Sequence, residues 1–554
     1  MGVSYYPPEM DAHLWRAYRS VEGQMKIGVV LQHAGKAPVW ITKLLYLLIA
    51  EPAIKLDVVY RVEGIPASPK PEPPAFFRLM QRDSERYAAP LAVVPIVVRP
   101  ACCFIDVEWD ETAGRFTEES SATIRARNLD ALIWLDALPQ AGDCGDLARL
   151  GVWSFALGDP SKPVSEPPYW REIAEREPVS TIALLRHPER LEDSQTIATH
   201  SAPTVLAWHF TTNAEVPTAM AGPMLIRGLL DALSAGPDWI ENLPAAVKRD
   251  QASFPSPTNA ASTRFVAQRL RHSLSVRSRP KVKRQGQWSI AIRPKQISED
   301  GWNPEGFRFI EQPSGSQYAD PFVIESDNRN FLFFEDVAAG SVKGRISALE
   351  LHPDGGCGEP FVVLEAPYHL SYPVVFKHAG EIYLLPESAE NRTVSLYRAR
   401  QFPDQWEHCA NLIEDMPVVD TTPFLHNSVW YFFATSKAPG VETFLLYSHD
   451  LQGRWQYHPT NPICSDARRA RGAGAIFKRH GNWIRPSQDS AGRYGSAVVF
   501  NEILRLSTTE YEERPVDRIL PDWHKGLKGM HTYNANDRFE AIDGLKFDPA
   551  LFDA

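Results

Sequence analysis

Three carboxylate residues of the C-terminal half stand at repeated positions beside hydrophobic strands. Asp320 and Asp420 each open such a strand, and Glu387 follows the second strand of another copy of the same pattern. Hydrolysis of a glycoside needs groups of this type, because one carboxylate activates water or attacks carbon while a carboxylic acid protonates the leaving oxygen. Crowding of carboxylates raises one pKa and keeps an acid protonated near neutral pH. We therefore predict that Asp320, Glu387 and Asp420 form an acid–base site.

A loose internal repeat supplies the elements that would position these groups. A strand opening followed by a hydrophobic strand recurs about every fifty residues, at 320–324, 372–376, 422–425 and 474–477, with a more degenerate fifth copy beginning near His531. Fixed-period β units of about this length indicate propeller blades. A propeller directs the inner strand of every blade to one axis, so residues far apart in sequence would meet in one pocket.

The pattern of the chain from residue 288 onward supports this architecture. Strand-like runs such as 330–334, 381–385 and 429–433 alternate with turn residues, and long helical periodicity is scarce. We predict an all-β, five-bladed propeller over residues 286–554.

The repeat also predicts where other polar residues point. Asp320 and Asp420 are expected on the floor of the central cavity, and Glu335 and Glu387 on its rim. Six residues are expected to bind substrate: Glu335, Arg471, Arg485, Gln488, Tyr494 and His531. Two arginines beside carboxylates fit recognition of an anionic group. The alternative is structural, with Asp residues capping turns and Arg485 holding blades together through an ion pair.

Seven short segments of this half carry a resemblance to a known family. They are 319–322, 334–336, 385–388, 419–424, 471–474, 485–488 and 494–495. Together they resemble the propeller domain at the N-terminus of plant glucosamine inositolphosphorylceramide transferases, which is similar to the five-bladed propellers of family 43 and family 32 glycoside hydrolases. The plant enzymes carry their glycosyltransferase in a separate C-terminal domain, so the resemblance does not imply sphingolipid glycosylation.

The resemblance implies a role for each of the three carboxylates. In the hydrolases the first Asp is base or nucleophile, a second Asp tunes a pKa, and a Glu is the acid. Carried over, Asp320 becomes the base or nucleophile, Asp420 the tuning carboxylate and Glu387 the proton donor. The hydrolases run Asp, Asp, Glu along the chain, whereas the order here is Asp320, Glu387, Asp420.

The N-terminal half has the alternation of an open α/β sheet. Short apolar runs typical of buried parallel strands alternate with helical segments. The expected strands are 25–31, 56–60, 131–135 and 151–155, and the expected helices are 39–48, 74–87 and 217–235. The order of these runs resembles the formyltransferase domain of the methionyl-tRNA formyltransferase type over residues 25–205.

The residues at that family's catalytic positions differ here. The formyltransferases use an Asn-x-His motif, in which the His moves protons and both residues stabilise an oxyanion. Ser154 and Ala156 stand at those positions, and alanine can do neither. We therefore expect a degenerate domain retained for docking or for binding a small ligand, with His187 and His200 as candidates for a substitute base.

Composition sets further limits. The 554-residue chain has a formal net charge of −10, which argues against a nucleic-acid partner. No apolar run reaches the roughly 18 residues that cross a bilayer. No secretory signal is visible, and the six cysteines show no CxxC pair or metal-ligand spacing, as in reduced cytoplasmic proteins. The expected segments are an extension at 1–24, the formyltransferase-like domain at 25–205, a helical segment and basic linker at 206–285, and the propeller at 286–554.

The common cofactor motifs are absent from the sequence. There is no Walker A loop, no G-x-G-x-x-G after a strand, no H-E-x-x-H and no G-x-S-x-G, so neither a cofactor nor a metal site is assigned. A divalent cation held by carboxylates in the propeller channel stays open.

The favoured function is that of a carbohydrate-active protein. We expect it to hydrolyse or transfer a glycosyl group of a small-molecule or glycan substrate, anionic ones included. Two alternatives stay open: a non-catalytic sugar-binding or ligand-binding protein of a glycan or secondary-metabolite pathway, and a formyl or acyl transferase with substituted catalytic residues.

Overall fold

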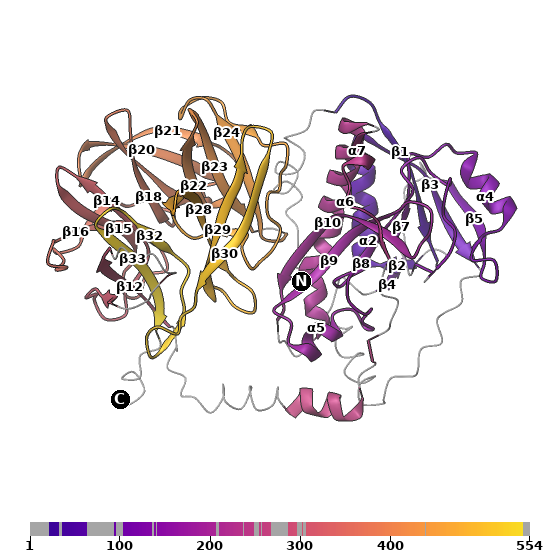
Figure 1. The fold of residues 1–554 in the computed structure, drawn as a ribbon, viewed down its shortest axis with the longest axis horizontal. Helices are drawn as coiled ribbons and strands as arrows, with labels where there is room; N and C mark the ends of the chain where they lie inside the picture. The colour runs from indigo at the N-terminus through magenta and orange to yellow at the C-terminus, as the bar shows by residue number, and fades with distance from the viewer. Residues whose placement is uncertain are drawn as a thin grey trace. The chain divides into compact units, whose positions relative to one another are not determined.

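Two units divide the chain, Arg19–Pro280 and Lys281–Ala554, in the computed structural model (Figure 1). The structure describes residues 21–32, 36–63, 93–95, 103–135, 138–139, 141–205, 210–236, 238–248, 254–255, 258–267, 286–295, 302, 306–437 and 439–546. The predicted helix at 74–87, the first twenty residues of the predicted extension and the basic linker beyond residue 267 lie outside the described residues.

The apolar runs of the N-terminal unit form one nine-stranded sheet with the order β11-β10-β9-β8-β7-β1-β3-β5-β6. Its strands are β1 Met25–Leu31, β3 Ile54–Glu63, β5 Cys103–Asp110, β6 Arg115–Phe116, β7 Ala131–Trp134, β8 Val152–Leu157, β9 Val179–His187, β10 Asp193–Pro203 and β11 Val247–Lys248. Strands β5, β3, β1, β7 and β8 are parallel. Strands β1, β3, β7 and β8 are the predicted apolar runs, whereas β5 is largely exposed and was not predicted. Strands β9 and β10 continue the sheet antiparallel. The predicted α/β sheet is therefore present as a mixed sheet.

Helix α6 (Glu215–Ala235) packs against both helix α2 (Val39–Ala50) and the sheet. Two glycines allow this close approach. A Cβ at Gly222 would lie 2.5 Å from the Leu47 side chain of α2, and one at Gly228 would lie 3.2 Å from Trp153 of β8. The helical part of the segment predicted at 206–285 is thus a layer of the sheet unit.

Smaller elements complete the N-terminal unit. They are β2 Lys36–Pro38, β4 Val93–Pro95, α4 Glu118–Arg125, α5 Trp170–Glu175, η2 Phe210–Ala214 and α7 Asp238–Glu241. Within the described ranges, no helix combines the length and the apolar character needed to cross a membrane.

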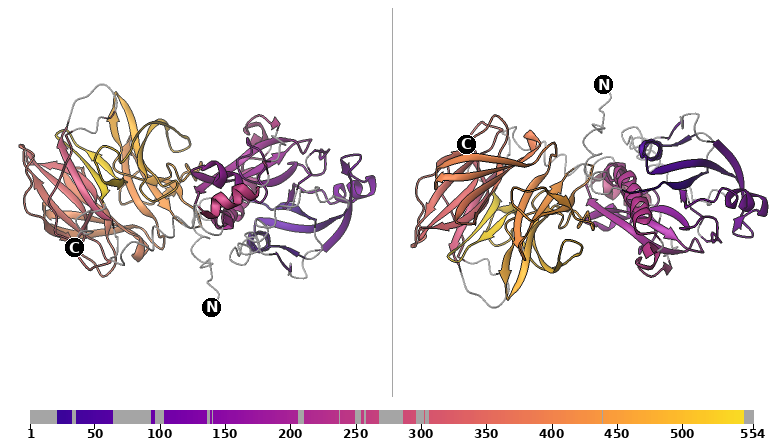
Figure 2. Two further views of the ribbon diagram at one scale, coloured as in Figure 1. Left: turned by 90° about the horizontal axis from the view of Figure 1, so that it is seen from below. Right: turned by 90° about the horizontal axis from the view of Figure 1, so that it is seen from above.

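The strand runs after residue 286 form five sheets, which are the blades of the predicted five-bladed propeller (Figures 1 and 2). Blade 1 contains β14 Gln317–Ser326, β15 Arg329–Val337, β16 Arg345–Leu351 and β17 Phe361–Leu364. Blade 2 contains β18 Ser371–His378, β19 Glu381–Ser388, β20 Thr393–Gln401 and β21 Gln405–Ile413, with η3 Ala389–Asn391 between strands. Blade 3 contains β22 Val419–His426, β23 Val429–Ser436, β24 Glu442–Ser448 and β25 Gln456–Tyr457.

Blade 5 closes the ring by joining the two ends of the domain. Blade 4 contains β26 Arg471–Gly472, β27 Phe477–Arg479, β28 Asn482–Asp489, β29 Ala497–Leu506 and β30 Tyr511–Ile519. Blade 5 combines β12 Gln287–Pro294 and β13 Arg308–Phe309 with β31 Leu527–Gly529, β32 Tyr533–Ala535 and β33 Phe539–Lys546. Strands β12 and β33 pair antiparallel along their full length. Apolar clusters fill the space between neighbouring blades all the way round, which confirms the closed ring.

The first strands of blades 1, 2 and 3 share an irregular start. Asp320, Tyr372 and Asp420 have left-handed backbones, with φ of 51°, 45° and 50°, and each lies at a register shift in the pairing with the second strand. Bulges of this kind bend a strand and re-aim a side chain. A left-handed φ costs a non-glycine residue about 1 kcal/mol or more. The surrounding structure must therefore hold these three residues in place.

Gly474→Ala is expected to lower the free energy of unfolding of the propeller by about 3 kcal/mol. Gly474 has a φ of 135°, and a Cβ there would lie 2.0 Å from the carbonyl oxygen of Tyr533 in blade 5. Gly481→Ala is the matched control, since its φ of 83° is also left-handed but nothing lies within 4 Å. It should cost only about 1 kcal/mol. Urea denaturation measures both, and equal losses would contradict the prediction.

Candidate functional site

Hydrogen bonds between neighbouring blades link the carboxylates at the propeller axis. Asp543 Oδ2 accepts the backbone N–H of Asp320 at 3.3 Å. Asp320 Oδ2 in turn accepts the backbone N–H of Tyr372 at 3.2 Å. Glu387 Oε2 accepts that of Asp420, also at 3.2 Å. Each carboxylate thus binds the left-handed residue that opens the next blade. The structure brings Asp320, Glu387 and Asp420 into one cluster.

Asp320 lies at the buried end of this cluster and is 5% exposed. Its Oδ1 accepts the hydroxyl of Thr532 at 2.8 Å and faces His531 Nε2 at 3.5 Å. Burial raises the pKa of Asp320 to about 7, and neighbouring carboxylates add to the rise, whereas His531 opposes it. Asp320 is therefore a carboxyl group whose proton can leave and return near neutral pH.

Glu387 is partly exposed at the cluster and has the character of an acid. Burial raises the pKa of Glu387 to about 8, and the charge of Asp420 adds to this effect. Arg471 and Lys437 act in the opposite direction. Glu387 therefore keeps its proton at neutral pH, which a general acid requires.

Asp420 is bound by a single arginine from blade 4. Arg471 donates from Nε to Asp420 Oδ2 and from Nη2 to Oδ1, the latter at 3.3 Å. Burial lowers the pKa of Arg471, but Asp420 outweighs burial, so the guanidinium stays charged. The guanidinium carbon lies 4.9 Å from the centre of the Tyr494 ring. Such a pair fixes a charge beside Glu387 without offering a free oxygen for nucleophilic attack.

Glu335 forms a second pair at the edge of the cluster. Its Oε1 faces His369 Nε2 at 3.1 Å. The Gly344 N–H donates to Nδ1 of the same ring at 2.9 Å, which fixes the neutral tautomer with its proton on Nε2. Glu335 raises the pKa of His369, and burial opposes this rise. The His369 ring thus holds Glu335 as an acceptor.

Aromatic rings line one side of the cluster. The centres of the Trp288 and His531 rings lie 4.1 Å apart, and those of the Tyr494 and His531 rings lie 5.3 Å apart. Tyr494 is 46% exposed, although it lies against Arg471 and His531. A half-exposed ring beside carboxylates is a surface on which a sugar can stack.

Two residues predicted to bind substrate are engaged elsewhere. The buried Arg485 side chain donates to both oxygens of Glu513, at 2.8 and 2.7 Å, and to the Arg469 carbonyl. The ion pair of the structural alternative is therefore present, but it ties β28 to β30 within blade 4 and does not hold two blades together. Gln488 is also fully buried and donates to the Gly472 carbonyl at 3.1 Å. With both Arg471 and Arg485 paired to carboxylates, the geometry gives no support to recognition of an anionic group by these arginines.

The sequence argument missed three residues that hold the cluster: Tyr372, Thr532 and Asp543. Tyr372 occupies the place of Asp320 and Asp420 in its blade, so an alignment of the repeat copies would have found it. Its hydroxyl contacts Thr422 and accepts the N–H of Gly474. Asp543 carried no signal, since it lies on the closing strand β33 outside the repeated pattern.

The three residues Asp320, His531 and Asp543 have ligand atoms within 4.8 Å of one another, as in a metal site. The donor set does not fit a hard divalent cation. Both imidazole nitrogens face carboxylates, and the carboxylate oxygens already accept backbone or hydroxyl donors. Calcium needs six to eight oxygen ligands, which this group does not offer. The cluster is balanced instead by a charged histidine.

The candidate bases of the N-terminal unit are buried inside it. His187 Nε2 and the Ser154 hydroxyl lie 2.8 Å apart, and His187 Nδ1 lies 3.0 Å from the Asp193 carbonyl. His187 and His200 are both 0% exposed, and Ala156 stands where formyl transfer needs a histidine. The geometry gives no support to formyl or acyl transfer by these residues.

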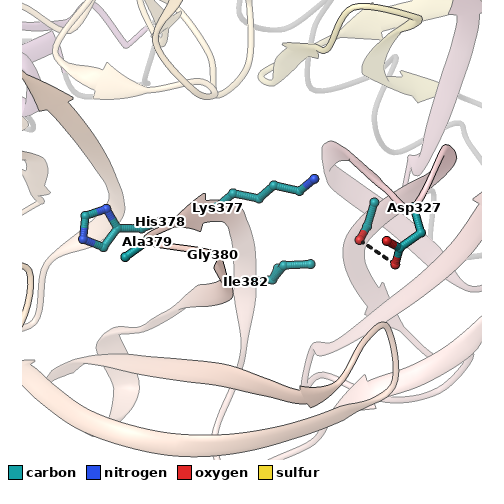
Figure 3. A pocket seen from close by; sticks show the side chains of 7 residues that line it. Asp327, Lys377, His378, Ala379, Gly380 and Ile382 are labelled. Atoms are coloured by element: carbon teal, nitrogen blue, oxygen red, sulfur yellow. Dashed lines mark hydrogen bonds between the residues drawn. The ribbon is translucent and has the colours of Figure 1, made fainter.

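A cavity of about 380 Å³ lies away from the carboxylates, between the first hairpins of blades 1 and 2 (Figure 3). It is lined by Ser326, Asp327, Lys377, His378, Ala379, Gly380 and Ile382. These residues form the hairpin ends of strands whose opposite ends carry Asp320 and Tyr372. None of the clustered carboxylates lines this cavity, so we do not place the candidate site in it.

Comparison with known proteins gives a match for the propeller. Residues 310–547 match the family model described as "Glucosamine inositolphosphorylceramide transferase 1, N-terminal". The glucosamine inositolphosphorylceramide transferase 1 of Oryza sativa subsp. indica is 33% identical over 233 residues, which cover 41% of this chain and 31% of the relative. The protein of the same name from Arabidopsis thaliana is 34% identical over 226 residues, which cover 39% of this chain and 29% of the relative. The chain thus spans less than a third of these relatives, and the predicted resemblance of its propeller is confirmed.

Solved structures of glycoside hydrolases are similar to part of this chain at low identity and low TM-score. One is Zg3597, a family 117 glycoside hydrolase of the marine bacterium Zobellia galactanivorans, at 12% identity and a TM-score of 0.32, covering 48% of this chain and 94% of that one. Another is CoXyl43, a GH43 beta-xylosidase/alpha-arabinofuranosidase from a compost microbial metagenome. It has 13% identity and a TM-score of 0.32, and the match covers 41% of this chain and 84% of CoXyl43. Such likeness concerns the fold alone. The formyltransferase resemblance of residues 25–205 stays a prediction.

Proposed function

We propose that the propeller cleaves or transfers a glycosyl group, with Glu387 as the general acid and Asp320 as the base or nucleophile. The observation that carries this is a pair of carboxyl groups with different neighbours in one cluster. Desolvation and the charge of Asp420 raise the pKa of Glu387 to about 8, whereas a charged His531 opposes the rise of the Asp320 pKa, which stays at about 7. Two carboxyl groups with separate tasks in one site are what glycoside chemistry requires.

The reaction can be written with these groups alone. In hydrolysis with Asp320 as base, Glu387 gives its proton to the glycosidic oxygen as the bond to the anomeric carbon breaks. Asp320 takes a proton from water, whose oxygen forms the new bond to that carbon. In transfer, an acceptor hydroxyl takes the place of water. Asp420, held by Arg471, supplies the negative charge that keeps Glu387 protonated.

The relatives support glycosyl chemistry in general and not their full activity. Their name describes a transferase, and this chain matches less than a third of their length. The sugar, its linkage and any lipid acceptor are therefore not carried over. Location in the cytoplasm stays a proposal from the sequence, as does the absence of a nucleic-acid partner.

The test is a mass-spectrometric screen of the full chain against a broad glycoside and nucleotide-sugar panel, with Asp320→Asn beside it. We expect turnover by the wild type and a loss of at least about 100-fold in the variant, because base or nucleophile is removed. Equal turnover by both proteins would contradict the assignment of Asp320.

A non-catalytic sugar-binding role is the second candidate. It is favoured by the number of hydrogen bonds that the carboxylates already make, since Asp420 is bound by Arg471 and Asp320 by Tyr372 and Thr532. The exposed ring of Tyr494 would then be the stacking surface. In this case the panel shows no turnover, while thermal shift shows a sugar that stabilises wild type and Asp320→Asn alike.

A further inference from the structure

A buried histidine joins two carboxylates through opposite sides of its ring. His531 Nδ1 lies 2.5 Å from Asp543 Oδ2, and its Nε2 lies 3.5 Å from Asp320 Oδ1. We propose that Asp543 and His531 form a positioning pair that orients the Asp320 carboxylate and shares one proton with it. The inference rests on the proposed function, in which Asp320 is the base or nucleophile.

Asp543 is fixed by backbone donors from two blades. Its Oδ1 accepts the N–H groups of His531 at 2.8 Å and Thr532 at 3.0 Å. Its Oδ2 accepts the N–H of Asp320 at 3.3 Å. Asp543 is 0% exposed and lies on β33, the closing strand of blade 5, whereas Asp320 opens blade 1. One carboxylate therefore sets the position of both its partners.

The His531 ring packs against two aromatic rings. The centre of the Trp288 ring lies 4.1 Å away at an interplanar angle of 33°, and that of the Tyr494 ring lies 5.3 Å away at 68°. These two rings also contact each other, with their centres 6.2 Å apart, so they cover adjacent sides of the imidazole and hinder its rotation. Nδ1 therefore stays toward Asp543, and Nε2 stays toward Asp320.

This arrangement decides where the protons reside. Burial lowers the pKa of His531, but Asp543 and Asp320 outweigh burial and raise it to about 9. His531 is in turn the group that opposes the rise in the pKa of Asp320 caused by burial. A charged imidazole favours the ionised form of a neighbouring carboxylate. Without it, the buried Asp320 would keep its own proton and could not take one from water.

The other charges around the pair act against it. Glu335 and Asp420, from blades 1 and 3, raise the pKa of Asp320, and Arg471 from blade 4 lowers that of His531. Glu387 of blade 2 also interacts with Asp320. Asp543 and Asp320 together keep His531 charged among these neighbours, and the charge of Asp543 also raises the pKa of Asp320 directly.

The test follows His531 by NMR in the full-length protein labelled with ¹⁵N-histidine, whose 16 histidines are sorted with a His531→Gln variant. In the wild type we expect the ring to stay charged until the pH approaches 9. In Asp543→Asn the same ring should lose its proton about two pH units lower, because burial then prevails. Asp336→Asn is the control, since Asp336 is also a buried aspartate, in blade 1, but pairs with Arg345 and Ser347.

A kinetic measurement separates this role from a merely structural one. In Asp543→Asn the acidic limb of kcat/KM should move to higher pH, because Asp320 loses its charged neighbour His531. The charge of Asp543 itself raises the pKa of Asp320, so its removal makes this shift smaller without reversing it. If that variant does not fold, Asp320→Asn should lower the His531 pKa by the same reasoning. A wild-type ring that titrates near 6.5, or one unmoved in both variants, overturns the proposal. Absence of turnover overturns the proposed function and leaves the NMR result standing.

Discussion

Glu387→Gln lowers kcat by about 1,000-fold for glycosides with poor leaving groups, yet by less than about tenfold for aryl glycosides with good ones. The reason is that an alkoxide leaving group needs a proton from Glu387, whereas a nitrophenolate leaves without one. Burial and the charge of Asp420 raise the pKa of Glu387 to about 8, so the side chain keeps this proton below that pH. The wild-type rate on the demanding substrate should therefore fall as the pH rises through about 8, and the variant should lack this limb.

The measurement is a set of pH–rate profiles on two substrates that share a sugar and differ in leaving group. Asp320→Asn should slow both substrates alike, because removal of a base or nucleophile does not depend on the leaving group. Glu407→Gln, a surface change in blade 2 where Glu407 pairs with Arg398 and Arg400, is the neutral control. Equal losses of Glu387→Gln on both substrates would remove Glu387 from the role of acid.

At high pH, Glu387→Gln should stabilise the protein although it lowers its activity. The pKa of Glu387 is raised in the folded state, so folding takes up a proton between about pH 4 and pH 8 and the wild type becomes less stable over that interval. Glu387→Gln lacks this dependence, and its amide oxygen can still accept the N–H of Asp420. The variant should therefore melt at a higher temperature than the wild type at pH 9, which also shows that its lost activity is not unfolding.

The propeller could be predicted from the repeat because the sequence of each blade contains the same short pattern. A strand opening, a hydrophobic strand and a turn return at a regular spacing, so the number of blades and the meeting of Asp320 and Asp420 follow from periodicity. The backbone at those openings was not visible, since Asp320, Tyr372 and Asp420 are not glycines and yet adopt left-handed angles. Tertiary hydrogen bonds between blades, and not local turn chemistry, hold them there.

The direction of a side chain was the harder inference. Arg471 and Arg485 both lie in blade 4, but one faces the carboxylates and the other faces Glu513, because strand register decides which side each takes. Asp543 contacts Asp320 across 223 residues, at the point where the chain closes the ring. No local pattern records such a pairing. In the N-terminal unit, apolar runs identified the parallel strands β1, β3, β7 and β8, but not the largely exposed β5. The place of α6 became visible only through its packing on α2 and the sheet.

Arg485→Met is expected to lower the free energy of unfolding by about 3 to 5 kcal/mol, because it leaves Glu513 buried without its partner. Both side chains are at most 3% exposed, and Tyr511 also donates to Glu513 at 2.6 Å. Burial raises the pKa of Glu513, but Arg485 outweighs burial and lowers it overall. The pair therefore stabilises the fold at pH values above the pKa of an ordinary glutamate. This contribution is lost as the pH falls through the lowered pKa of Glu513.

A double-mutant cycle by chemical denaturation measures the pair. The double variant Arg485→Met/Glu513→Gln should lose less than the sum of the two single variants, because neither partner is then left as a lone buried charge. Arg505→Met, which breaks an exposed pair with Glu512 in the same blade, should leave stability unchanged within error. Sugar affinity of folded Arg485→Met should match the wild type, since its contacts lie between β28 and β30. A stable Arg485→Met with weakened sugar binding would instead return Arg485 to the substrate site, and the ion pair with Glu513 would then be incidental to the fold.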